Sequence, residues 1–269
     1  MINKIIHYCW FGGKRKPELV RDCIKSWKKH LPEYKIIEWN EKNADLSHPF
    51  VQHAYKMKKW AFVADYVRLT VLYENGGLYL DTDMLVLKPL DSFLINDCFF
   101  GAEDNNYINC AIIGAIKNNN LIKKCLLKYD SVEINKEINW FELVIPIIIT
   151  NIFRSEYGYN NGFDIDIVKI NNVVIYPTIY FYPFPFNCKN DIANFKKYIR
   201  LESHSVHLWV GSWFPYNEFH YIRTREYSKG LGLVFNNLLL GKLNLKYMRK
   251  LASSVKQSFT IKSIDTTFS

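Results

Sequence analysis

The chain has 269 residues, 49% of them hydrophobic, and a formal net charge of +9. This length allows one large α/β domain or two small ones, and the hydrophobic content is high enough for a sizeable core. The positive charge favours anionic partners, such as nucleic acid, a nucleotide diphosphate or an anionic membrane.

The first forty residues alternate between strand and helix patterns. Residues 2–11 predict a strand that ends at a Gly-Gly turn, 17–31 an amphipathic helix, and 34–40 a second strand. This order begins a βαβ unit, which predicts a parallel sheet. Beside the turn, Trp10 either packs in the core or stacks on a base, and Gly12 lets a ligand approach the backbone.

Residues 60–89 contain the central motif. Apolar residues at three- and four-residue steps predict a helix that ends at Asn75, before a second Gly-Gly pair. A short apolar strand then leads to Asp81 and Asp83. Two carboxylates two residues apart on extended backbone point to the same side, so they can hold a divalent cation. The chain has neither a dinucleotide-binding G-x-G-x-x-G nor a P-loop, so a metal is the natural way to bind a diphosphate.

The helix before this motif carries Asp65 and Arg68, three residues apart and therefore on one face. They form either a structural ion pair or a pair that binds a donor substrate. A second Asp-x-Asp, at Asp164 and Asp166, alternates with isoleucines, which predicts the solvent-exposed face of a half-buried strand.

Further elements follow the central motif. Residues 99–103 and 109–115 are strand-like, 121–129 predict a helix, and the proline-rich segment 176–186 predicts a loop that packs on the sheet. Glu103 and Asp104 read as solvated loop acids, with contact to a sugar or acceptor as the alternative. The six cysteines lie far apart without a C-x-x-C pair and, with no secretory leader, predict reduced cytoplasmic thiols.

A second informative stretch covers residues 203–213. It brings His207, a possible metal ligand, close to Ser212 and Trp213, which can donate to phosphate. Beyond it the chain is helical and basic, a pattern typical of a solvated face or of a surface that contacts an anionic membrane.

The central motif resembles the signature of glycosyltransferase family 32, whose members contain a DXD motif. This family is related to capsule and O-antigen enzymes and, more distantly, to clostridial glucosylating toxins. The residues that carry the resemblance are Ala61, Ala64, Asp65, Arg68, Gly76, Gly77, Tyr79, Leu80, Asp81, Thr82 and Asp83. The resemblance reaches from the N-terminus to about Trp213. It implies a GT-A fold with a helix-flanked, mostly parallel sheet, a nucleotide-sugar donor that is usually UDP-linked, Mn²⁺ or Mg²⁺, and retention of configuration.

The resemblance also implies roles for single residues. Asp83, His207 and Asp81 would hold the metal; Asp65 and Asp81 would bind ribose and sugar hydroxyls with support from Arg68; and Asn109 would lie near the transferred sugar. Trp10 would stack on the uracil, next to Gly12, while Ser212 would contact the metal or phosphate and Trp213 the β-phosphate. Many relatives have two adjacent histidines, whereas Leu208 follows His207 here.

The sequence therefore predicts a metal-dependent retaining hexosyltransferase or N-acetylhexosaminyltransferase with a lipid-linked saccharide acceptor, acting in bacterial surface polysaccharide synthesis. Residues 1–220 would form the catalytic domain and 221–269 a basic helical extension, in a cytoplasmic protein at the inner face of the plasma membrane. The alternatives are a metal-dependent nucleotidyltransferase or phosphohydrolase and a non-catalytic sugar-nucleotide-binding protein. A nucleic-acid-binding role is not expected, because the basic residues are spread out rather than arrayed with exposed aromatics.

Overall fold

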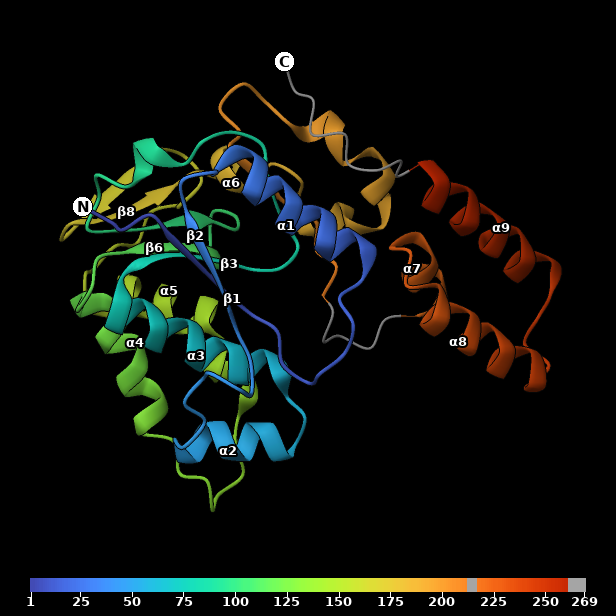
Figure 1. The fold of residues 1–269 in the computed structure, drawn as a ribbon, viewed down its shortest axis with the longest axis horizontal. Helices are drawn as coiled ribbons and strands as arrows, with labels where there is room; N and C mark the ends of the chain where they lie inside the picture. The colour runs from blue at the N-terminus through green and yellow to red at the C-terminus, as the bar shows by residue number, and fades with distance from the viewer. Residues whose placement is uncertain (212–216, 261–269) are drawn as a thin grey trace.

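The computed structural model describes residues 1–211 and 217–260 and shows an α/β fold around a seven-stranded sheet (Figure 1). The sheet has the strand order β2-β1-β3-β6-β5-β8-β7. Its strands are β1 (Ile5–Cys9), β2 (Lys35–Trp39), β3 (Gly77–Leu80), β5 (Cys98–Ala102), β6 (Ile108–Ala115), β7 (Val168–Ile170) and β8 (Val173–Tyr176). A separate two-stranded sheet pairs β4 (Met84–Val86) with β9 (Ser205–His207).

The central sheet is mixed. Strand β1 runs parallel to β2 and β3, and β5 runs parallel to β8. Strand β6 is antiparallel to β3 and β5, and β7 is antiparallel to β8. The predicted α/β class with a helix-flanked sheet is confirmed, but only half of the pairings described within this central sheet are parallel, so the expectation of a mostly parallel sheet was wrong. The reason is that β6 and β8 each follow the preceding strand after a short connection, which makes an antiparallel hairpin.

Helices cover both faces of this sheet (Figure 1). One face packs against α2 (Pro49–Lys56), α3 (Trp60–Asn75), α4 (Asn120–Asp130) and α5 (Ile145–Ser155), and the other against α1 (Glu18–His30) and α6 (Thr178–Phe181). In β3, Tyr79 belongs to the first core, whereas Leu78 and Leu80 belong to the second, because successive strand residues point to opposite faces. Short 3₁₀ turns cover Asp91–Phe93 (η1) and Trp140–Leu143 (η2), and a longer, kinked 3₁₀ segment covers Phe186–Tyr198 (η3).

The Gly76–Gly77 turn sets where β3 begins. Both glycines have positive φ, +65° and +108°, which side chains disfavour. A Cβ atom on Gly77 would lie 2.7 Å from the carbonyl oxygen of Ile5 in β1. Glycine therefore ends α3 and also allows β3 to lie beside β1, as the sequence predicted for the helix end.

Two predicted elements need correction. Asp164 and Asp166 lie in bends rather than on a strand, and β7 begins only at Val168. Asp164 instead accepts hydrogen bonds from the backbone N–H and the hydroxyl of Thr178, at 2.6 and 3.1 Å. Those bonds hold the start of α6, a short helix inside the segment that was expected to be a loop.

The C-terminal part is helical, as predicted. It contains α7 (Glu218–Arg223), α8 (Tyr227–Leu239) and α9 (Leu245–Thr260). The predicted domain boundary after residue 220 falls inside α7, and the division into two domains stays a prediction. Within the described ranges, every helix is too short or too polar to cross a membrane.

Candidate functional site

A large cleft of about 990 Å³ opens beside the ends of β1 and β3. The loop after β1, the first half of α3, the Asp81–Asp83 segment and β6 line it from the body of the fold. The segment after β9 and the start of α8 line it from the C-terminal part. It therefore joins parts of the chain that lie more than 200 residues apart.

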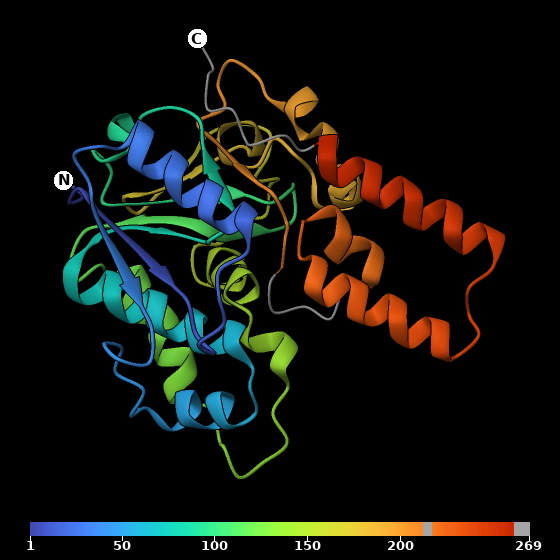
Figure 2. The same ribbon diagram turned by 45° about the vertical axis from the view of Figure 1, so that its right-hand side comes forward.

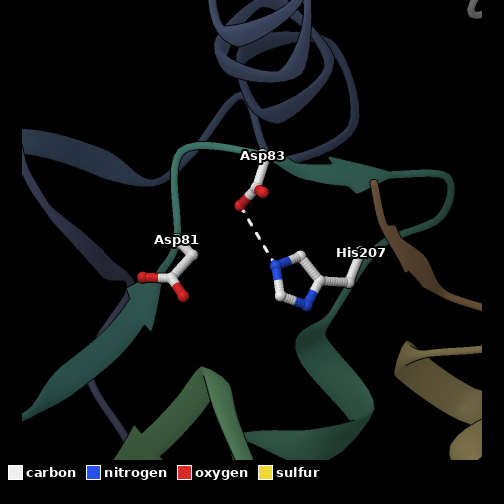
Figure 3. A group of neighbouring side chains, drawn as sticks. All are labelled: Asp81, Asp83 and His207. Carbon is white, nitrogen blue, oxygen red and sulfur yellow. Dashed lines mark ion pairs between the residues drawn. The ribbon is translucent and has the colours of Figure 1, made fainter. Parts of the chain in front are cut away.

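Asp81 and Asp83 lie between two strands that belong to different sheets. Asp81 follows β3, and its N–H donates to the carbonyl of Ala111 in β6 at 2.8 Å. The chain then turns, so that β4 leaves the central sheet and pairs with β9, with Met84 opposite His207. Because Asp83 precedes Met84, this register brings its carboxylate to the His207 side chain. The three side chains point into one space (Figure 3), and one ligand atom from each lies within 4.8 Å of the others.

Asp83 and His207 form a buried ion pair, with 3.2 Å between Asp83 Oδ1 and His207 Nε2. The second carboxylate oxygen of Asp83 accepts a hydrogen bond of 2.8 Å from the N–H of Val210. Burial disfavours the charge on each group, but their mutual attraction outweighs it, so the pKa of His207 is raised and the pKa of Asp83 is lowered. Each group therefore favours the charged form of the other.

Arg68 connects α3 to the end of β3. Its guanidinium lies 3.0 Å from Asp65 and 3.2 Å from Asp81, and it donates to the carbonyl of Cys110 at 2.9 Å. Burial raises the pKa of Asp65 to about 6, although Arg68 opposes the shift, while Asp81 adds to it. Burial likewise raises the pKa of Asp81, with Arg68 again opposing. The predicted Asp65–Arg68 pair exists, and it also reaches the Asp-x-Asp motif.

Trp10 lies on the cleft wall, where its indole N–H donates to the carbonyl of Lys14 at 2.6 Å. The Lys16 ammonium sits 5.6 Å from the centre of the indole ring. Gly12 lies outside the cleft lining, and its N–H donates to Glu41 at 2.6 Å rather than facing the cleft. The structure thus brings Trp10, but not Gly12, to the site.

Asn109 lines the cleft, and its side-chain oxygen accepts from the N–H of Ala111 at 2.8 Å. Its amide nitrogen donates to Glu103 at 2.8 Å. Glu103 also lines the cleft, and burial raises its pKa, against the opposing effect of Asn109. Reading Glu103 as a solvated loop acid therefore missed a cleft residue. Its position at the end of the buried strand β5 was the available signal.

The segment after β9 adds an aromatic wall. Trp209 packs its ring 3.9 Å from the ring of His207, and its indole N–H donates to the carbonyl of Phe184 at 2.7 Å. Its φ of +52° is rare for a bulky residue and marks strained backbone next to the candidate site. The sequence did not single out Trp209. The predicted phosphate contacts Ser212 and Trp213 lie outside the described residues.

The donor set fits a divalent cation. The two carboxylates are suitable ligands for Mn²⁺ or Mg²⁺, and the imidazole nitrogen favours Mn²⁺, the softer of the two ions. The Nε2 atom of His207 faces Asp83 Oδ1 at 3.2 Å, so this nitrogen is the one placed to bind an ion together with the two carboxylates. Asp81, Asp83 and His207 would hold the ion.

Basic side chains also line the cleft. They come from the loop after β1, from α1, from η3, from the α7–α8 connection and from the start of α8, and they are Lys14, Arg15, Lys16, Arg21, Lys189, Arg225 and Lys229. This field favours an anionic ligand such as a diphosphate.

Comparison with known proteins identifies the segment that carries the motif. Residues 17–100 match the family model described as glycosyltransferase sugar-binding region containing DXD motif. The chain is 34% identical over 104 residues to the initiation-specific alpha-1,6-mannosyltransferase of Candida albicans, which covers 35% of this chain and 27% of that protein. It is 32% identical over 131 residues to the uncharacterized glycosyltransferase L373 of Acanthamoeba polyphaga mimivirus, which covers 44% of this chain and 51% of that protein.

The chain thus spans about a quarter to a half of the length of the curated relatives it matches. Among solved structures, the PaToxG glycosyltransferase aligns over 58% of this chain and 70% of that chain, with 20% identity and a TM-score of 0.48. The matched residues 17–100 include Asp65, Arg68, Asp81 and Asp83, so the glycosyltransferase sugar-binding region with its DXD motif is the part of the chain for which a family likeness is found.

Proposed function

We propose that this protein is a metal-dependent glycosyltransferase that takes a hexose or N-acetylhexosamine from a nucleotide sugar, UDP-linked, and passes it to a saccharide acceptor. The observation that carries the proposal is the convergence of Asp81, Asp83 and His207 at the wall of a cleft that Trp10 and Arg68 also line. The cleft is large enough for a nucleotide sugar, because ligand pockets of this kind measure about 300–1,000 Å³.

Asp81, Asp83 and His207 would bind Mn²⁺ or Mg²⁺, and the bound ion would offset negative charge on the leaving diphosphate. Trp10 would stack on the base at the other end of the donor. Asp65 and Asp81 would accept hydrogen bonds from donor hydroxyls, while Arg68 keeps both carboxylates in place.

Asn109 and Glu103 extend the sugar-binding wall. Their mutual hydrogen bond fixes the orientation of both side chains before any ligand binds. The second carboxylate oxygen of Glu103 can then accept from a sugar or acceptor hydroxyl. Such preorganisation favours transfer, because the polar groups need not reorient during the reaction.

The finer points of the proposal come from the sequence resemblance. They are retention of configuration, a lipid-linked acceptor, a role in bacterial surface polysaccharide synthesis such as capsule or O-antigen, and a cytoplasmic location at the membrane. Proton NMR of the transfer product would test retention directly, because the two anomers have different coupling constants.

The decisive experiment is a donor screen in the presence and absence of Mn²⁺. UDP-glucose, UDP-galactose, their N-acetylated analogues and GDP-mannose would each be tested for sugar release and transfer. We expect metal-dependent turnover of one donor that Asp83→Asn abolishes. Asp166→Asn is the matched control, because Asp166 ends the other Asp-x-Asp and is exposed outside the cleft lining. Loss of activity in both variants, or an altered nucleotide without a released sugar, would contradict the proposal.

A further inference from the structure

The α8–α9 segment extends away from the sheet and its covering helices. Both views show α8 leading outward from α7 and α9 returning toward the body (Figures 1 and 2). Near the body, the hydroxyl of Tyr227 donates to that of Ser258 at 2.9 Å, and Arg225 donates to the carbonyl of Ser258 at 3.0 Å. The far end, residues 238–245, connects the two helices. We call this far end the tip.

Apolar side chains are exposed along α8 and around the tip. Leu231, Phe235 and Leu238 follow one another at four- and three-residue steps, so they share one face of α8. The exposed set, between 48% and 70% accessible, is Leu231, Phe235, Leu238, Leu239, Leu240, Leu245 and Met248. A contiguous set of this kind marks an interaction surface rather than an ordinary solvated helix.

The charge around this surface is of one sign. Residues 227–260 contain six Lys or Arg residues and no Asp or Glu. Lys229 pairs with Glu226 near the body, but Lys242, Lys246 and Arg249 are exposed beside the apolar residues of the tip. Apolar side chains flanked by basic ones are complementary to an anionic lipid surface.

The arrangement of the leucines favours a bilayer over a protein partner. Leu238, Leu239 and Leu240 are consecutive and all exposed, and successive helical residues point about 100° apart, given 3.6 residues per turn. They therefore project around much of the circumference of the helix end. A protein would need a socket that encloses the tip, whereas the fluid interface of a bilayer accommodates side chains in every direction.

We propose that the tip inserts into the headgroup region of an anionic bilayer and holds the cleft beside the membrane. Tyr227, Ser228 and Lys229, at the start of α8, line the cleft. They lie about 15–18 Å from Leu239 along the helix, at ~1.5 Å per residue. A saccharide carried on a membrane lipid could therefore reach the cleft. This consequence for the acceptor rests on the proposed function, whereas membrane binding itself does not.

The test is co-sedimentation of the full chain with vesicles of phosphatidylcholine alone or mixed with phosphatidylglycerol. We expect the wild-type protein to sediment with the anionic vesicles and much less with the neutral ones. Phe235→Ser combined with Leu239→Ser should lower the partition coefficient at least tenfold at any salt concentration. Lys242→Gln combined with Lys246→Gln should lower it about twenty-five-fold at low salt and little at high salt, since each basic residue contributes roughly a factor of five.

The matched control is Ile95→Ser combined with Leu201→Ser, which removes two side chains that are 74% and 85% exposed outside α7–α9. It should bind like the wild type. Circular dichroism checks that each variant folds. Absence of wild-type binding to anionic vesicles would overturn the proposal, as would equal binding by the Phe235/Leu239 variant. Dimerisation in solution that this variant abolishes, without vesicle binding, would instead assign the tip to a contact between copies.

Asp83→Asn separates the two proposals. It should sediment with anionic vesicles as the wild type does, although it lacks transferase activity. Failure of the donor screen with intact vesicle binding would remove the proposed function alone, and the reverse result would remove the docking surface alone.

Discussion

Arg68 on helix α3 contacts the carboxylate of Asp81 at the end of β3, with 3.2 Å between the guanidinium nitrogen and Asp81 Oδ1. The same oxygen accepts from the hydroxyl of Tyr79 at 3.1 Å. One oxygen of Asp81 is thus engaged with the protein, while the other remains available to the cleft. The contact therefore joins helix α3, the first half of the motif, to the end of strand β3, its second half.

Replacing Arg68 should destabilise the fold strongly. Arg68→Ala leaves the buried carboxylate of Asp65 and the neighbouring Asp81 without their counter-charge. We expect the free energy of unfolding to fall by about 3–5 kcal/mol, as for other broken buried pairs. Urea denaturation measures the change. Combining Arg68→Ala with Asp65→Asn should recover part of the loss, and a double variant no more stable than Arg68→Ala would argue against this ion pair.

Trp10 should contribute to donor binding through its ring. Trp10→Ala removes a stacking surface worth about 1–3 kcal/mol, so the Kd for UDP with Mn²⁺ should rise roughly ten- to a hundredfold. Isothermal titration calorimetry gives this constant. Trp10→Phe keeps an aromatic face and should lose much less. Equal affinities for the alanine variant and the wild type would exclude the stacking role.

Glu103 should act in substrate binding rather than in stability. Glu103→Gln keeps an oxygen that can accept from Asn109 but removes the charge that would strengthen a bond to a hydroxyl. We expect kcat/KM to fall about ten- to a hundredfold, for ~1.5–3 kcal/mol of charge-assisted hydrogen bonding, with little change in Tm. Asp104→Asn is the control, because Asp104 caps its own loop through the N–H groups of Asn106 and Tyr107. Similar kinetics for both variants would count against Glu103.

The stability of the protein should fall on acidification partly because of His220. Burial lowers the pKa of this imidazole to about 4, and the positive charges of Arg223 and Lys189 add to the shift. As the pH falls, the imidazole in the unfolded chain therefore binds a proton near pH 6.5, whereas the imidazole in the folded chain binds one only near pH 4. The stabilisation is present above pH 6.5 and is lost as the pH falls toward 4, by up to ~3 kcal/mol at 1.36 kcal/mol per pKa unit.

Thermal unfolding from pH 7.5 to 4 measures this dependence. His220→Gln has no titrating group at this position, so its Tm should fall less steeply over the same range. Parallel curves for the two proteins would show that another group controls acid unfolding. Asp65, whose raised pKa acts in the opposite direction, is common to both proteins and cancels in the comparison.

The sequence determined the local elements and the chemistry of the motif. Helix α3 and its glycine end, the short strand β3 and the position of Asp81 and Asp83 follow from periodicity, from glycine and from strand geometry, all of which act over a few residues. The resemblance also supplied His207, far away in the chain. The helix, the glycine turn and the strand depend on residues that are neighbours in the sequence, and they could therefore be predicted from the sequence.

Tertiary structure decided how distant segments meet. The antiparallel pairing of β4 with β9 places His207 beside Asp83, and the bond from Asn109 holds Glu103 at the cleft. The contact of Arg68 with both Asp65 and Asp81 likewise depends on which segments pack together. The same is true of Asp164 and Asp166, which lie in bends rather than in the predicted strand. The partner of a strand, the burial of a side chain and the walls of a cleft depend on residues that are distant in the sequence. The sequence neighbours of a residue do not specify which distant segment will pack against it and exclude water.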